Sequence, residues 1–81
     1  MTFVCVKKKP NKKFLKILGK HIRELREKQG ISQSQLGFET GLHRDQIGRI
    51  ELGKQNTSIT NIEAIASALE ISLKDLVDFE Y

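Results

Sequence analysis

A short central segment holds side chains that can hydrogen-bond to nucleic-acid bases or phosphates. Arg44 and Arg49 each carry a planar guanidinium, which can pair through two parallel N–H groups with guanine O6 and N7. Gln46 is the next candidate for a base contact, and His43 lies at the turn before it. Asp45 has two interpretations, a carboxylate stabilised by a helix N-terminus or an acid that accepts only from cytosine N4 and so excludes other bases.

Catalytic and metal chemistry lack a comparable pattern. The sequence has no paired carboxylates, no nucleophile beside a base and no glycine-rich phosphate loop, so we expect no enzyme activity. Neither histidine has partners at metal-ligand spacing, and we expect no metal or cofactor. The single cysteine, Cys5, can form no internal disulfide, which is typical of a cytoplasmic protein. No apolar run approaches the roughly 20 residues that cross a membrane.

Helices must position the central side chains, and hydrophobic spacing predicts the first of them. An apolar stripe recurs at steps of three or four residues, as one face of a helix does. The glycine after the stripe, Gly30, is predicted to end this helix. The stripe consists of Phe14, Leu18, Ile22 and Leu25, and the polar Gln29 continues the same spacing.

Two shorter helices are expected next. Ser32 begins a capping-box pattern that opens a helix ending at about residue 40, and Gly41 can adopt the positive φ of a tight turn. A second helix then runs from about residue 44 to residue 52. Ile47 and Ile50 form its inward face, which leaves the arginines outward.

The C-terminal third is predicted to form two more helices after a polar loop at residues 54–59. Thr60 with Glu63, and Ser72 with Asp75, are capping-box patterns that open them. We therefore predict an all-α fold, a compact five-helix domain around one aliphatic core. The inward residues of these two helices are Ile62, Ile65, Ala66, Leu69, Leu73, Leu76 and Val77.

Residues 32–53 match a helix-turn-helix arrangement, two short helices joined by a turn that contains glycine. In such pairs the first helix lies across the DNA backbone and the second reaches into the major groove. Gly48 is interpreted as allowing close approach to the DNA backbone. The predicted base contacts are His43, Arg44, Asp45, Gln46 and Arg49. The predicted phosphate contacts are Ser32, Gln33, Gly48, Lys54 and Gln55.

Four blocks of sequence occur in a fixed order. They are Ile31-Ser32-Gln33-Ser34-Gln35-Leu36, Gly41-Leu42, Ile47-Gly48-Arg49-Ile50-Glu51-Leu52-Gly53-Lys54 and Leu69-Glu70-Ile71-Ser72-Leu73. In this order they resemble the lambda-repressor-like, XRE-type helix-turn-helix family. The resemblance covers about residues 18–78 and extends to phage repressors and to the controller proteins of restriction-modification systems.

The resemblance implies five helices, DNA binding and a homodimer. It also implies a buried salt bridge between Arg26 of the first helix and Glu51 of the third. The chain departs from the family pattern at Gly37, where the family usually has alanine. A glycine within a helix costs about 1 kcal/mol relative to alanine, so this helix is expected to depend more on packing or close approach.

The chain is small, and its charge is unevenly spread. It has 81 residues and a net charge of +4, enough for one small domain. Residues 1–30 hold ten basic and two acidic side chains, whereas residues 55–81 hold one basic and five acidic ones. The N-terminal end should therefore meet a polyanion more readily than the C-terminal end.

The two ends of the chain leave alternatives open. Residues 1–13 are predicted to be a basic N-terminal arm or short strand ahead of a domain at residues 14–81. This segment could be a solubilising charged face, a flexible arm laid on DNA, or a strand of Phe3–Val6 that pairs with a second subunit. At the other end, Leu76, Phe79 and Tyr81 are predicted to form a two-fold dimer interface. The alternative is that the aromatic rings of Phe79 and Tyr81 both fold back on their own subunit.

The leading functional prediction is a sequence-specific DNA-binding transcriptional regulator. It would act as a homodimer on a pseudo-palindromic operator, so its partners are double-stranded DNA and a second copy, with no membrane. One alternative is an antitoxin or bridging-type module whose main partner is another protein. A second alternative is a basic protein that coats nucleic acid without sequence preference.

Overall fold

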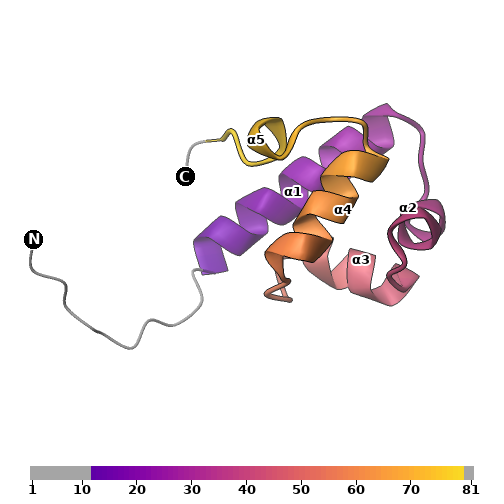
Figure 1. Ribbon diagram of the computed structural model, residues 1–81. Helices are drawn as coiled ribbons and strands as arrows, with labels where there is room; N and C mark the ends of the chain where they lie inside the picture. Colours follow the sequence, from indigo (N-terminus) through magenta and orange to yellow (C-terminus); the bar gives the residue numbers. More distant parts are fainter. Residues whose placement is uncertain (1–11, 80–81) are drawn as a thin grey trace, which may run out of the picture.

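The computed structural model describes residues 12–79, and this range folds into five helices with no strand (Figure 1). The all-α prediction is confirmed for these residues. The helices are α1 (Lys12–Lys28), α2 (Gln33–Thr40), α3 (Arg44–Glu51), α4 (Ile59–Ala68) and α5 (Leu73–Leu76).

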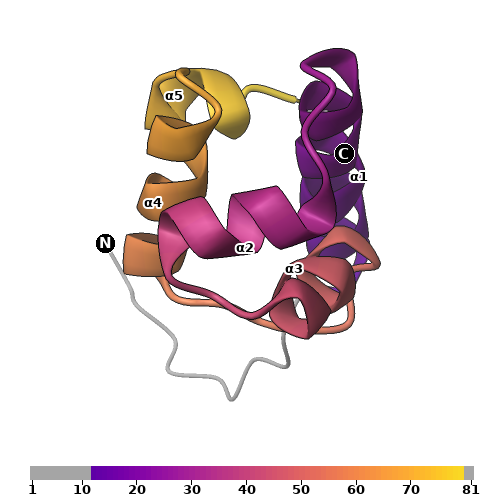
Figure 2. The ribbon, with the colours of Figure 1, turned by 90° about the vertical axis from the view of Figure 1, so that its right-hand side faces the viewer.

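The short helices α2 and α3 are held between the two longer ones. Figure 2 shows α2 across the front of the molecule, with α3 below it, α1 on one side and α4 and α5 on the other. α2 contacts α3 and α4, α1 contacts α3 and α5, and α4 contacts α5. The helix-turn-helix pair is therefore supported by α1 behind α3 and by α4 behind α2.

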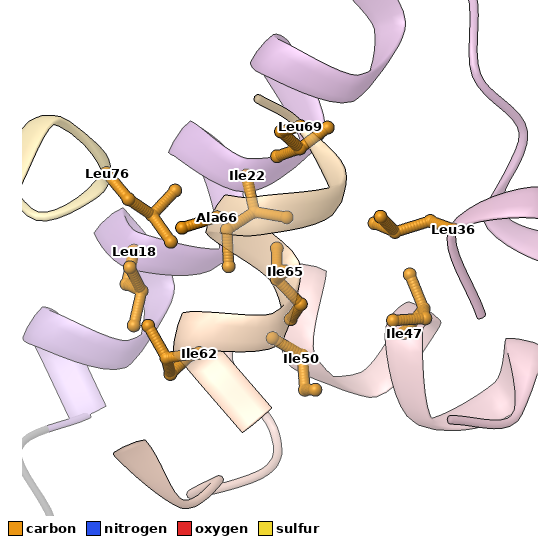
Figure 3. Packing of buried hydrophobic residues seen from close by; sticks show 10 residues of the cluster. All are labelled: Leu18, Ile22, Leu36, Ile47, Ile50, Ile62, Ile65, Ala66, Leu69 and Leu76. Carbon is orange, nitrogen blue, oxygen red and sulfur yellow. The ribbon is translucent and has the colours of Figure 1, made fainter. Parts of the chain in front are cut away.

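All five helices contribute to one aliphatic core, which Figure 3 shows. Leu18 and Ile22 of the α1 stripe lie in it, as do the inward positions predicted in α3 and α4, and Leu69 reaches it from the C-cap of α4. Gln29, which continues the spacing of the predicted stripe, is exposed instead and donates from Nε2 to the Leu69 carbonyl at 2.7 Å. Phe14 and Leu25 pack against the edge of the core. The ten buried hydrophobic residues are Leu18, Ile22, Leu36, Ile47, Ile50, Ile62, Ile65, Ala66, Leu69 and Leu76.

Serine side chains begin three of the helices. Ser32 Oγ accepts a hydrogen bond from the backbone N–H of Gln35 at 3.0 Å, and Ser72 Oγ accepts from Asp75 at 3.0 Å, as predicted. The prediction for α4 is wrong, because Ser58, not Thr60, caps it. Ser58 Oγ accepts from the backbone N–H of the residue three positions on at 3.1 Å. This start also lets the Asn61 amide donate to Thr57 Oγ1 at 3.0 Å, which ties the preceding loop to the helix.

The described part of the chain starts with α1. α1 begins at Lys12, so Lys12 and Lys13 belong to the helix, consistent with the high helix propensity of lysine. The remainder of the predicted arm, including Phe3–Val6 and Cys5, lies outside the described residues. No helix in the described part of the chain is long and apolar enough to cross a membrane.

Candidate nucleic-acid interface

Close approach of backbone to backbone sets the angle between α2 and α3. Gly41 ends α2 with a φ of +79°, and the backbone N–H of Leu42 returns to the carbonyl of Gly37 at 2.9 Å. A Cβ on Gly37 would lie 2.7 Å from the Leu42 carbonyl oxygen and 3.2 Å from the backbone nitrogen of Arg44. The glycine that departs from the family pattern therefore lets α2 contact the turn directly.

α3 exposes one face to solvent. Its opposite face is buried through Ile47, Ile50 and Glu51, so the helix cannot rotate without exposing the core. Arg44, Asp45 and Arg49 are exposed. The Arg44 guanidinium lies 3.8 Å from the Asp45 carboxylate in a solvated pair, which contributes little to stability. These three candidate base-contacting side chains thus lie on a fixed helix and are open to solvent.

Arg49 is oriented by a hydrogen bond within its own subunit. Its Nε donates to Gln55 Oε1 at 3.0 Å, so a residue of the loop after α3 orients the guanidinium. Both residues had been predicted as DNA contacts from separate parts of the sequence, and the structure brings them together.

His43 and Gln46 cooperate at the start of α3. His43 is the N-cap residue, and its backbone N–H donates to Gln46 Oε1 at 3.1 Å. Gln46 is half-buried, so its carbonyl oxygen is engaged in the cap while the amide nitrogen stays available. His43 thus has the helix-cap role that is the ordinary alternative for a histidine at this position, and Gln46 has a structural role that the sequence prediction for it did not include.

A buried polar network connects α1, α2 and α3. Arg26 Nε and Nη2 donate to the two carboxylate oxygens of Glu51 at 2.6 Å and 3.1 Å. Arg26 Nη1 also donates to the carbonyl of Ile31 at 2.7 Å, and Gln33 Nε2 donates to Glu51 Oε1 at 3.0 Å. The hydrogen bond to Glu51 raises the pKa of the Arg26 guanidinium above its usual value, against the opposing effect of burial. Arg26 is therefore permanently charged, and Glu51 holds both it and Gln33.

Gly48 lies beside Gln33. A Cβ at this position would lie 3.7 Å from Gln33 Nε2 and 3.8 Å from Gln33 Oε1, which are ordinary contact distances. The fold of the subunit thus does not require glycine here. The interpretation that Gly48 allows close approach to a DNA backbone stays a prediction.

Residues of α1, α2 and α3 surround a shallow hollow of about 620 Å³ at the N-terminus of α2. The unpaired backbone N–H groups of the first turn of a helix, together with its dipole, favour an anion. Arg23 lines the hollow although the sequence prediction omitted it, and its spacing of three residues from Arg26 was the available signal. The lining residues are Arg23, Arg26, Ser32, Gln33, Ser34, Arg44, Gly48, Glu51 and Leu52.

The predicted dimer interface needs correction. Leu76 has 0% exposure and belongs to the core of its own subunit, because α5 turns this side chain towards α1 and α4. Phe79 is half-buried against α1, with its ring centroid 5.4 Å from that of Phe14 and 5.8 Å from that of His21. Tyr81 lies outside the described residues. Of the two rings left open from the sequence, Phe79 folds back on its own subunit.

The geometry described above agrees with that of known proteins. Residues 22–76 match the helix-turn-helix family HTH_3. Control protein C.BamHI of Bacillus amyloliquefaciens is 45% identical over 64 residues, which are 78% of this chain and 79% of that protein. The crystal structure of the restriction-modification controller protein C.AhdI from Aeromonas hydrophila superposes with a TM-score of 0.79 at 38% identity, covering 84% of this chain and 99% of that one. The biofilm regulator SinR, solved in complex with DNA, has a TM-score of 0.70 at 31% identity over 75% of this chain and 98% of its own.

Proposed function

Because the chain belongs to the helix-turn-helix family HTH_3, we infer that it is a sequence-specific DNA-binding transcriptional regulator that acts as a homodimer. It is similar to controller proteins and, at 32% identity over 78% of the chain, to the immunity repressor of Bacillus phage phi105. The observation that carries this proposal is the exposed face of α3, which presents Arg44 and Arg49 on a helix fixed by the core. The operator is a pseudo-palindrome, since two copies related by a two-fold axis read two equivalent half-sites.

Roles follow from position on the surface. Arg44 and Arg49 contact base edges in the major groove, with Asp45 beside them to exclude bases that lack a donor. His43 and Gln46 are further base contacts at the start of α3, where the Gln46 amide nitrogen stays available. The remaining predicted contacts are with the phosphates of the DNA backbone, and they are made by Ser32, Gln33, Gly48, Lys54 and Gln55.

A different apolar surface from the one predicted fits a second copy. Ile59 is 66% exposed and Val77 is 38% exposed, and both line an apolar hollow of about 190 Å³. Phe14 and Leu15 of α1 border the same hollow. Neither Arg44 nor Arg49 lines this hollow, so a partner seated there leaves both free for DNA.

Selection from random duplex DNA with the purified protein at physiological salt tests the function. We expect an inverted repeat whose half-sites lie about 10 base pairs apart. Arg44→Ala should then weaken binding to the recovered site by about 1–3 kcal/mol and relax preference at one position of each half-site. Lys74→Ala on α5 serves as the control and should change neither.

Two other outcomes would contradict the proposal. Recovery of no motif, with binding that disappears as salt rises, would favour a basic protein that coats nucleic acid. Recovery of no motif together with a protein that co-purifies in stoichiometric amounts would favour the antitoxin or bridging alternative.

A further inference from the structure

Three lysines surround a second hollow, at the end of α3 away from its N-terminus. Lys12 and Lys16 are four residues apart and share one face of α1. Lys54 belongs to the loop after α3. The hollow has a volume of about 610 Å³ and is open to solvent. Its lining residues are Lys12, Leu15, Lys16, Leu52, Gly53, Lys54 and Asn56.

Gly53 brings these lysines together. Its φ is +72°, and a Cβ there would lie 2.6 Å from Lys16 Cα and 2.8 Å from Lys16 N. Only glycine lets the loop lie directly on the backbone of α1 in this conformation. The close contact fixes Lys54, the next residue, beside the N-terminal half of α1.

The charge of this hollow is not neutralised. No carboxylate lines it, and among residues 12–79 none of the three lysines forms an ion pair. All three are exposed, so the cluster is available to a partner. The 620 Å³ hollow differs, because its buried Arg26 is already paired with Glu51. Three like charges held close together attract a polyanion more strongly than the same charges spread apart.

The position of the cluster fits a DNA backbone. Leu52, the C-cap residue of α3, lines both hollows, so they adjoin each other along the exposed side of the helix. A helix lying in the major groove is flanked by phosphates at both of its ends. The N-terminus of α2 lies where it can contact the phosphates on one side of α3. α1 and the loop after α3 lie where they can contact the phosphates on the other side (Figure 1).

We propose that Lys12 and Lys16, together with Lys54, form a second phosphate-binding site that anchors α1 to the DNA backbone. The proposal rests on the proposed function, because its ligand is the backbone of the bound duplex. The ammonium groups act as point charges on phosphate oxygens and carry no base preference. The N-terminal half of α1 thereby becomes part of the DNA-binding surface.

The test measures how DNA affinity depends on salt. The variant Lys12→Gln/Lys16→Gln keeps both side-chain stems and removes two charges. The matched control Lys13→Gln/Lys20→Gln removes two charges from exposed positions of the same helix that do not line the hollow. Both variants are assayed on the recovered operator and on a duplex of random sequence, after thermal unfolding has shown that both are folded.

We expect the first variant to lower the magnitude of the slope of log K against log salt by about 1–2, since each lost phosphate contact contributes about 0.9. The loss should be the same on both duplexes, and ethylation of the phosphates that contact the site should no longer interfere with binding. The control should keep nearly the wild-type slope. An unchanged slope in the first variant, or an equal loss in the control, would overturn the site. Failure of the wild-type protein to prefer any sequence would overturn the proposed function instead, while the slopes on random duplex would still decide the lysine site.

Discussion

At the scale of single residues, Glu51 couples the fold to the candidate interface. Its carboxylate accepts from Arg26 of α1 and from Gln33 at the start of α2, while its own helix carries Arg44 and Arg49. The family resemblance was sufficient to predict the pairing of Arg26 with Glu51. It was not sufficient to predict that Gln33 shares the same carboxylate, because that contact depends on the angle at the turn, which the missing side chain of Gly37 sets.

Removal of the Glu51 carboxylate should leave a buried positive charge without a partner. We expect Glu51→Leu to lower the free energy of unfolding by about 3–5 kcal/mol. The double variant Arg26→Met/Glu51→Leu should recover most of that loss, because both charges and their desolvation disappear together. Urea unfolding of the wild type, both single variants and the double variant measures the coupling. Losses that simply add would show that the pair does not act as a unit.

At the scale of the helices, local signals predicted most starts and the inward faces. The capping serines at residues 32 and 72 each begin a capping-box pattern, and both were identified. Ser58 and Thr60 are both good caps two residues apart, and the choice depends on a contact between Asn61 and Thr57 that the pattern does not encode. The four-residue α5 is too short for periodicity to separate the buried Leu76 from the exposed Val77.

Substitution by alanine at two helical glycines should change the stability of the protein in opposite directions. A Cβ on Gly19 of α1 would meet the carbonyl oxygen of Ile50 and lie 2.6 Å from that of Glu51, where α1 crosses α3. Because both neighbours are backbone atoms, we expect Gly19→Ala to destabilise the protein by about 1–3 kcal/mol. Gly48→Ala meets only ordinary contacts, so it should stabilise the protein by up to about 1 kcal/mol through helix propensity. Thermal unfolding measures both changes.

The DNA affinity of Gly48→Ala tests the separate role predicted for this residue. If Gly48 admits a DNA backbone, the more stable variant should bind its operator less tightly than the wild type. Unchanged affinity would show that the glycine has no role in binding. Gly19→Ala does not alter the exposed face of α3, so any affinity it loses should follow its loss of folded protein.

At the scale of the whole molecule, charge and apolar surface divide between different regions. The basic hollow lies beside α3, whereas Glu63, Glu70, Asp75 and Asp78 belong to α4, α5 and the residues after them. This asymmetry turns α1 and α3 towards a polyanion and the acidic helices away from it. The sequence predicted the charge asymmetry correctly as a property of the chain. Of the residues it placed at the dimer contact, Leu76 is buried in its own subunit and Phe79 packs against α1, because leftover apolar side chains do not reveal whether their own subunit can cover them.

The exposed apolar surface around Ile59 should hold the dimer together. A charge at this position would be buried without a partner in the interface, so we expect Ile59→Glu to shift the protein to monomer at micromolar concentrations in sedimentation. Phe38→Glu is the matched control, because Phe38 is 88% exposed on α2 and does not line the apolar hollow. Operator affinity should fall together with dimerisation, since a monomer engages one half-site and loses the gain from binding both. If Phe38→Glu dissociates the dimer and Ile59→Glu does not, the two-fold contact lies on α2. The two copies of α3 would then be placed differently relative to each other on the operator.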